Sequence, residues 1–405
     1  MAKAPKRPKT GRRLPRRARG GRRSKVALVC AGGGITGAVY EIGCLRALED
    51  LLDRSVADLD LYVGVSGGAF VTSLLASGIS PREMYDALAF PRRGGFGDPT
   101  SSLFRLGLGE IWQRSRRAPQ VLAEALRGHL SPDGRRWSEV AWALFELLPA
   151  GLLDNSGLEE YLARLFAARG QANDFASLPR PLHVIAVDLD SGEAVDFGPG
   201  HEPRVPVSKA VQASTALPGL YRPVRIDGRD YVDGAVKKTA HINLAIESGA
   251  DLVICVNPIV PVDNRSGALG AHLSSKGVTY VLDQVLRIAL HGRMQYGLER
   301  YQAEHPEVDI LLLEPTRDDL RMFSYNIMQY SARKVVAAHG SESTLQSFPL
   351  HEDAYRRLLR RHGLTLRDPG RLPHRPSVSP YGSHVARSLS GSLDLLSSAL
   401  RRRAG

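Results

Sequence analysis

Two short apolar runs near the start of the chain end in glycine clusters, and this feature limits the possible folds more than any other. Val26–Ala31 stops at the glycine run Gly32–Gly34, and Leu59–Val65 stops at Ser66, which stands between glycines. Apolar runs of this length that end at turn residues predict buried strands. Between them, Ala38–Leu52 repeats apolar residues with the spacing of an amphipathic helix. A strand, a helix and a second strand with short joints indicate a parallel sheet with crossover helices.

Later segments fit the same architecture. Ser80–Glu83 supplies the N-cap serine, first-position proline and third-position glutamate that begin a helix. Further apolar strands are expected at Leu182–Val187, Asp251–Val256 and Val308–Leu313. The turn residues Asp227–Gly228 between two short β-type runs predict a hairpin. We therefore predict an α/β protein with three layers, α/β/α, and a mainly parallel sheet.

The charge separates both ends of the chain from its body. The formal net charge is +12, yet residues 1–25 carry twelve Lys/Arg and no acid. Residues 355–405 carry eleven Arg and two Asp, which leaves 31 basic and 40 acidic residues in 26–354. The body is therefore acidic and both ends are basic.

Composition and charge suggest three parts. Residues 1–25 lack the apolar side chains needed for order, so we expect a disordered basic arm. This arm is either a solubilising tail or an attachment to anionic lipid; nucleic acid is disfavoured because no nucleic-acid-binding motif accompanies the arm. Residues 26–350 are expected to form the folded domain, and 351–405 a basic C-terminal tail. Residues 91–150 interrupt the sheet pattern as a helical insertion, which is either a lid or an ordinary helical layer.

The cysteines and the apolar segments suggest where the protein resides. Cys30, Cys44 and Cys255 are too few and too scattered for a disulfide framework or a zinc site. Cys30 and Cys255 stand in apolar runs, so we expect buried, reduced thiols and a reducing compartment. No stretch reaches the ~20 apolar residues of a membrane span, and the basic arm lacks the apolar core of a signal peptide. We expect a cytoplasmic protein, with at most peripheral membrane contact.

The glycine run lies where backbone N–H groups gather at a predicted helix N-terminus and attract negative charge. Gly32, Gly34 and Gly37 match the dinucleotide-binding spacing, but Ser66, not an acidic residue, ends the second strand. A P-loop is excluded because Ala38 stands where its lysine is required. The third interpretation is an oxyanion hole, in which the N–H groups face a developing alkoxide.

Gly64–Gly68 has the pattern G-x-S-x-G at the end of an apolar run and the start of a small-residue helix. These glycines allow a sharp turn that exposes the Ser66 hydroxyl, as in a nucleophile elbow. The structural alternative is a glycine-rich turn whose serine only caps a helix. The upstream glycine run favours the elbow, with Gly32, Gly33 and Gly34 as the oxyanion hole.

A serine nucleophile requires a base to take its proton. The later histidines, among them His241, His272, His291 and His305, stand in no clear strand-end signature. Asp233 instead ends a predicted strand and precedes a glycine, so its side chain is expected at the carboxyl edge of the sheet. Asp233 is therefore the predicted base.

Four motifs, in this order, resemble those of the patatin-like phospholipases. They are Gly32–Gly37 for the oxyanion loop, Gly64–Gly68 for the elbow, Ala213–Pro218 with its A-S-x-A-x-P pattern, and Tyr231–Gly234 for the base. The resemblance extends over about residues 26–350. It implies a lipid acyl hydrolase of the phospholipase A or lysophospholipase type, with a Ser–Asp dyad and no catalytic histidine.

The resemblance also implies a role for each matching residue. Ser66 would be the nucleophile, Asp233 would take its proton, and the N–H groups of Gly32, Gly33 and Gly34 would hold the oxyanion. An aspartate with its usual pKa of ~3.9 is a weak base, so burial must raise that pKa. The chemistry requires no metal or organic cofactor, and the expected partner is a lipid or lysolipid substrate, with anionic membrane contacted through the basic ends.

Two residues depart from the family pattern. Thr36 stands where Arg or Lys is frequent, which removes a positive charge near the substrate head group and weakens the case for phosphate-bearing substrates. Ala235 stands where a second glycine often follows the base, which is a mild change. Two other functions remain open: an acyltransferase that uses the same nucleophile, typically with a histidine, and a non-catalytic, membrane-associated protein.

Overall fold

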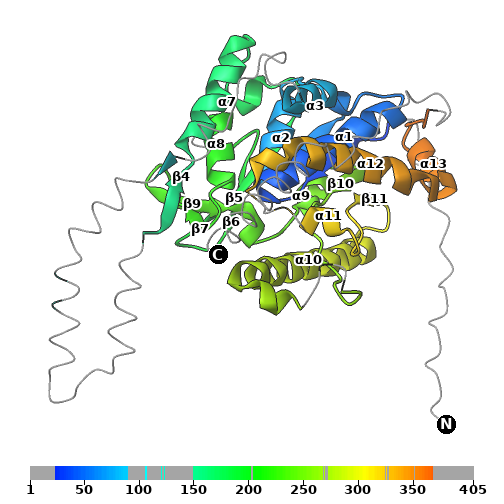
Figure 1. Cartoon of the computed structure of the whole chain (residues 1–405). Helices are drawn as coiled ribbons and strands as arrows, with labels where there is room; N and C mark the ends of the chain where they lie inside the picture. Colours follow the sequence, from blue (N-terminus) through cyan, green and yellow to red (C-terminus); the bar gives the residue numbers. More distant parts are fainter. Residues whose placement is uncertain are drawn as a thin grey trace.

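The computed structural model describes residues 23–89, 105–106, 120, 123, 149–201, 204–267, 269, 272–323, 325, 328–350 and 352–367. Within this part, helices cover both faces of a central sheet, and the protein is a three-layer α/β/α structure (Figure 1). The predicted fold class is confirmed. Most of the expected arm at 1–25 and of the expected insertion at 91–150 lies outside these residues, so the lid stays a prediction.

The main sheet is parallel through its centre and antiparallel at one side. In spatial order its strands are β11 (Asp309–Leu313), β10 (Leu252–Val256), β1 (Val26–Cys30), β2 (Leu61–Val65), β5 (Leu182–Asp188), β9 (Arg229–Asp233) and β8 (Val224–Ile226), and β6 (Ala194–Phe197) also pairs with β5. The strands from β11 to β5 are parallel, whereas β6 and β9 run antiparallel to β5. A smaller sheet consists of β3 (Arg105–Leu106), β4 (Gly151–Asp154) and β7 (Gly219–Tyr221).

The strand order creates a crevice at the carboxyl end of β1. After β1 the chain continues to β2 and β5 on one side, and it reaches β10 and β11 on the other side only later. Such a switch point is where open α/β sheets form ligand sites. The glycine run follows β1 and Ser66 follows β2, so the topology brings both to this crevice.

Two groups of helices cover the sheet. On one face lie α1 (Gly34–Leu51), α2 (Gly67–Ala76), α3 (Pro81–Ala89), α7 (Ser156–Ala168), α8 (Val207–Ser214) and α12 (Arg333–Leu350), and on the other α9 (Ile242–Glu247) and α10 (Val278–Glu304). Alternate residues of β1 serve the two cores: Val26, Leu28 and Cys30 face the first group, and Ala27 and Val29 face the second. Because both faces are covered, β1 is apolar at every position.

The predicted turns and caps are present. Asp227 and Gly228 have φ of 47° and 82°, the left-handed values that a tight hairpin between β8 and β9 requires. The backbone N–H of Glu83 donates to Ser80 Oγ over 3.2 Å, and the N–H of Ser80 donates to Glu83 Oε2 over 2.9 Å. This reciprocal pair is a capping box at the start of α3.

Helices α1 and α2 both begin at glycines, and α1 begins earlier than predicted. α1 starts at Gly34, where Ala38 was expected, and α2 starts at Gly67, directly after Ser66, so that it begins within the G-x-S-x-G pattern. The apolar periodicity could not reveal this because the first turns consist of glycine and small residues. The glycines are thus parts of helix N-termini, whose N–H groups point to the crevice at the carboxyl edge of the sheet.

The expected boundary at residue 350 is wrong. Residues 352–367 form helix α13 (Glu352–Arg361) and a short extension, in which Leu359 and Leu364 are fully buried. Leu366 then forms an isolated bridge with Leu52 of the body. The apolar positions of this segment bury against the domain although its arginines stay at the surface, so net charge alone suggested a loose tail.

All three cysteines are buried and unpaired, as expected for Cys30 and Cys255. Burial raises the pKa of the Cys44 thiol to about 12 and raises the pKa values of Cys30 and Cys255 as well. These thiols therefore serve as small apolar core residues.

Helices α1 and α12 pack so closely that glycine is needed at their contact. A Cβ at Gly43 would collide with the carbonyl oxygen of Ala337, and one at Gly340 with the carbonyl oxygen of Tyr40. We expect Gly43→Ala to lower the free energy of unfolding by about 1–3 kcal/mol, because overpacking outweighs the better helix propensity of alanine.

The matched control is Gly292→Ala, inside helix α10. No atom lies within 4 Å of a Cβ added there, so we expect a gain of up to ~1 kcal/mol from propensity alone. Urea unfolding of both variants measures the difference. Equal changes in the two proteins would contradict the close packing of α1 and α12.

Candidate active site

Ser66 stands at a strained turn between β2 and α2. Its φ is 54° and its ψ is −124°, a conformation that costs a residue with a side chain about 1–3 kcal/mol. The neighbouring glycines are required because a Cβ at Gly64 would collide with Thr72 Oγ1, and one at Gly68 with the carbonyl oxygen of Cys30. The chain therefore makes a sharp, strained turn from strand to helix at Ser66.

Asp233 ends β9 and is almost fully buried. Its Oδ1 accepts a hydrogen bond from the backbone N–H of Ala235 over 2.9 Å, and its own N–H donates to the carbonyl of Ala216 over 3.0 Å. These two bonds hold the carboxylate at the carboxyl edge of the sheet. One carboxylate oxygen, Oδ2, is left for other partners.

The A-S-x-A-x-P segment connects the elbow to the aspartate. The backbone N–H of Ser66 donates to Ser214 Oγ over 2.9 Å, and this hydroxyl donates to the carbonyl of Ile185 on β5 over 2.6 Å. Two residues later, Ala216 holds the backbone of Asp233. The segment therefore positions both predicted catalytic residues, a role that the sequence motif alone did not reveal.

The glycine run packs against both predicted catalytic loops. A Cβ at Gly32 would lie 2.8 Å from the Ala235 Cβ and 3.4 Å from the Ser66 Cβ, so only glycine fits between them. The N–H of Gly32 donates to the carbonyl of Thr239 over 3.0 Å. The prediction that all three glycine amides are free for an oxyanion is therefore wrong for Gly32, whose N–H the fold already uses.

The backbone amides of Gly33 and Gly34 differ from that of Gly32 in their hydrogen bonding. Within the described part of the chain, neither N–H donates to a backbone or side-chain acceptor. Gly34 has a φ of 61° and begins α1, so both N–H groups belong to the first turn of a helix. The positive end of the helix dipole adds to their attraction for an anion.

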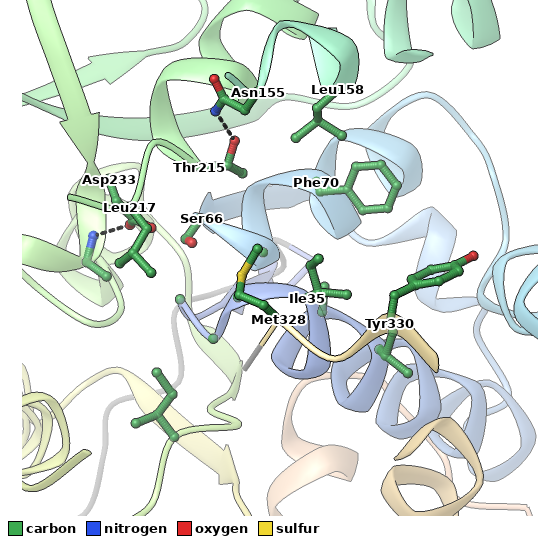
Figure 2. Close-up of a pocket in the computed structure, with 18 of the residues that line it drawn as sticks. Ile35, Ser66, Phe70, Asn155, Leu158, Thr215, Leu217, Asp233, Met328 and Tyr330 are labelled. Carbon is green, nitrogen blue, oxygen red and sulfur yellow. Dashed lines mark hydrogen bonds between the residues drawn. The ribbon is translucent and has the colours of Figure 1, made fainter. Parts of the chain in front are cut away.

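Ser66 and Asp233 line one cavity of about 320 Å³. Figure 2 shows Asp233 on one side of Ser66 and Phe70, Leu158 and Tyr330 on the other. The wall is mostly apolar, with side chains contributed by Ile35, Phe70, Leu74, Met84, Leu158 and Tyr330. The cavity therefore suits a long apolar group placed next to the serine hydroxyl.

Polar groups enter the cavity at two places. One place is formed by Asn155 and Thr215, which lie above Ser66 in Figure 2. Asn155 Nδ2 donates to Thr215 Oγ1, and the two atoms are 3.1 Å apart. On the α10 side lie Asp283, Arg287 and Arg293, which the sequence analysis did not single out. Helical periodicity across residues 278–304 would have placed Arg287 on the inner face, but nothing in the sequence linked α10 to the site.

Burial dominates the electrostatics of the site. Desolvation raises the pKa of Asp233 to about 6, against the opposing effects of hydrogen bonding from Ser66 and from the Ala235 amide. Among the described residues, no histidine lines the cavity. His241 is buried outside the cavity wall, and desolvation lowers its pKa to about 4. The structure thus brings Ser66 and Asp233 together and leaves the histidines of the described residues outside the cavity wall.

In the part of the chain that the structure describes, no group of three or more His, Cys, Asp or Glu side chains is arranged to hold a metal ion. No helix in the same part of the chain is long and apolar enough to cross a bilayer.

A model of the family described as patatin-like phospholipase matches residues 28–246, more than half of the chain. The chain belongs to the patatin-like phospholipase family. The matched region contains the glycine run, Ser66 and Asp233. Among curated relatives, uncharacterized NTE family proteins of Mycobacterium tuberculosis and Mycobacterium bovis are 35% identical to it over 80 residues. This alignment covers 20% of the chain and 21% of each relative, so it spans about a fifth of their length.

Two solved structures align with more of the chain but at low identity. VipD of Legionella pneumophila covers 82% of this patatin-like chain and 67% of its own, with 15% identity and a TM-score of 0.39. Human GIVD cytosolic phospholipase A2 covers 84% and 60%, with 14% identity and a TM-score of 0.34.

Ser214→Ala tests how the elbow is held. The substitution removes the hydroxyl that bonds both the buried N–H of Ser66 and the carbonyl of Ile185. We therefore expect the free energy of unfolding to fall by about 1–3 kcal/mol. In Ser73→Ala the lost hydroxyl contacts only the carbonyl of Phe70 in its own helix, and the expected cost is below ~1 kcal/mol. Thermal unfolding of both proteins gives the comparison, and equal losses would show that Ser214 has no special role.

Proposed function

We propose that this patatin-like protein hydrolyses acyl esters of lipids, as a phospholipase A or lysophospholipase, with Ser66 as nucleophile and Asp233 as general base. The main support is the meeting of a strained serine turn and a buried carboxylate in one apolar cavity. The free amides of Gly33 and Gly34 support an oxyanion hole of two N–H groups, with Gly32 as a packing residue.

The chemistry follows from these positions. Ser66 Oγ attacks the ester carbonyl carbon while its proton passes to the Asp233 carboxylate. The carbonyl oxygen becomes an oxyanion, which the amides of Gly33 and Gly34 stabilise. The intermediate collapses, Asp233 returns the proton to the leaving alkoxide, and an acyl-serine remains. Water then attacks the acyl-serine, Asp233 takes its proton and returns it to Ser66, and the fatty acid leaves.

The cavity also suggests how a lipid is placed. The apolar wall around Phe70 and Leu158 fits an acyl chain on one side of Ser66. Arg287 and Arg293 from α10 also line the cavity. Arg287 is paired with Asp283 over 2.8 Å, so Arg293 is the guanidinium that supplies the positive charge that Thr36 lacks, which supports a phosphate-bearing head group despite that departure from the family pattern.

Substitution of the two residues tests the dyad directly. We expect Ser66→Ala to abolish hydrolysis of a short-chain nitrophenyl ester and of phospholipid vesicles. Asp233→Asn keeps the acceptor for the Ala235 amide but removes the base, so kcat/KM should fall by about 10²–10⁴-fold.

Asp188→Asn is the matched control for that substitution. Asp188 is also a buried strand-end aspartate that accepts from backbone N–H groups, yet it lies outside the cavity wall. We expect its kcat/KM to stay within about threefold of the wild type, an effect below ~1 kcal/mol. If Asp233→Asn keeps full activity while a histidine variant loses it, the proposed dyad is wrong, and the alternative of a histidine-dependent acyltransferase is favoured.

The acidity of Asp233 predicts a pH dependence. The carboxylate form must accept the serine proton, and its pKa is raised to about 6. We therefore expect kcat/KM on a soluble ester to rise with pH through about 6 and then to level off. A profile that stays flat between about pH 5 and 7 would contradict Asp233 as the base.

A further inference from the structure

Helix α10 carries apolar side chains on the side that faces away from the protein. Among the described residues, eleven large apolar side chains are exposed, and eight of them belong to this one helix. Leu282, Val285 and Ile288 are 61%, 55% and 54% exposed. A concentration of this kind on one element marks an interaction surface rather than the scattered exposure of an ordinary surface.

The helical period makes the pattern clear. Val278, Val281, Leu282, Val285 and Leu286 recur at intervals of three and four residues and form one continuous side, here called the α10 stripe. The inner side of the same helix carries buried Leu290, Met294 and Leu298, and also the polar side chains of Arg287 and His291. A surface helix normally turns its polar side to water. The stripe therefore fits an apolar partner better than it fits water.

The stripe adjoins the mouth of the Ser66 cavity. Leu286 belongs to the stripe and also lines the cavity. The cavity is lined as well by Val236, which is outside the stripe, is 45% exposed and lies three residues after Asp233. Asp283 and Arg287, between the stripe and the core, line the cavity as well. Figure 1 shows α10 along one edge of the molecule, outside the other helices. Whatever covers the stripe is therefore next to the path to the serine.

The charges beside the stripe are positive on balance, because Asp283, next to Leu282, is paired with Arg287 over 2.8 Å. Between His272 and Leu282 the one Lys, Arg, Asp or Glu is Lys276, whose ammonium lies 5.4 Å from the ring centre of Tyr280. Arg293 is exposed at the other end of the stripe and donates to the carbonyl of Val236. An apolar helix side flanked by cations is typical of helices that lie in the interface of anionic bilayers.

We infer that the α10 stripe is a docking surface for a bilayer that contains anionic phospholipid. Docking places the mouth of the cavity against the lipid, so that a single lipid reaches Ser66 without crossing water. The choice of lipid as the partner rests on the proposed function, whereas the apolar stripe and its flanking cations rest on α10 alone. A second copy of the chain would explain the exposed stripe, but neither the cations nor the continuity with the cavity.

Vesicle binding by a stripe variant tests the inference. All proteins carry Ser66→Ala, so that no lipid is consumed, and are sedimented with vesicles of phosphatidylglycerol and phosphatidylcholine. In Leu282→Gln/Val285→Gln, glutamine keeps the helix and the net charge but removes two apolar side chains. We expect its vesicle affinity to fall by at least about tenfold. The control is Leu152→Gln on β4, since Leu152 is 53% exposed and lies outside the cavity wall.

The outcomes separate docking from catalysis. Unchanged vesicle binding by the stripe variant, or an equal loss in Leu152→Gln, overturns the inference, whatever the oligomeric state. With Ser66 intact, the stripe variant should cleave a soluble nitrophenyl ester like the wild type and vesicle lipid at least about tenfold more slowly. If the wild type cleaves no ester but the stripe variant still loses vesicle binding, docking is supported and the proposed hydrolysis is wrong.

Discussion

The hydrogen bond from the Ser66 amide to Ser214 is the contact on which the site depends. The elbow holds Ser66 at a φ that side chains rarely adopt, so the turn needs outside support. Ser214 provides it from α8 and is itself fixed to the carbonyl of Ile185 on β5. Since Ala216 holds the backbone of Asp233, a single segment contacts both Ser66 and Asp233 and fixes their separation. The strained backbone of Ser66 is thus held in place by hydrogen bonds that connect it to α8 and, through Ser214, to β5.

The separation of the two residues also depends on the sheet. Ser66 follows β2 and Asp233 ends β9, and β5 lies between these strands. β9 runs antiparallel to β5, so it brings Asp233 to the carboxyl edge from a hairpin rather than from a crossover helix. Asp233 therefore lies between strand β9 and the short 3-10 turn Gly234–Val236, which leaves it little freedom to move away from Ser66.

Much of this arrangement was predictable because the local sequence signals indicate the same strands and turns that the fold contains. Apolar runs and glycines identified the central strands, the elbow and the position of Asp233, since each of these needs particular residues in a particular order. The partner of the Gly32 amide was not predictable because Thr239 lies far away in the sequence. The same holds for α10, whose Arg287 reaches the cavity only through tertiary packing. The packed segment 352–367 was missed because charge masked its few buried leucines.

The three buried thiols have a practical consequence for the chemistry of the whole chain. Their raised pKa values keep them as neutral thiols in the core, where electrophiles and oxidants react slowly. The sequence contains no other cysteine. An electrophilic probe would therefore meet few competing sulfur nucleophiles, and labelling would report on oxygen nucleophiles such as a reactive serine rather than on thiols. The core thereby makes the protein suited to active-site titration, in which the fraction of competent molecules is counted rather than inferred from rates.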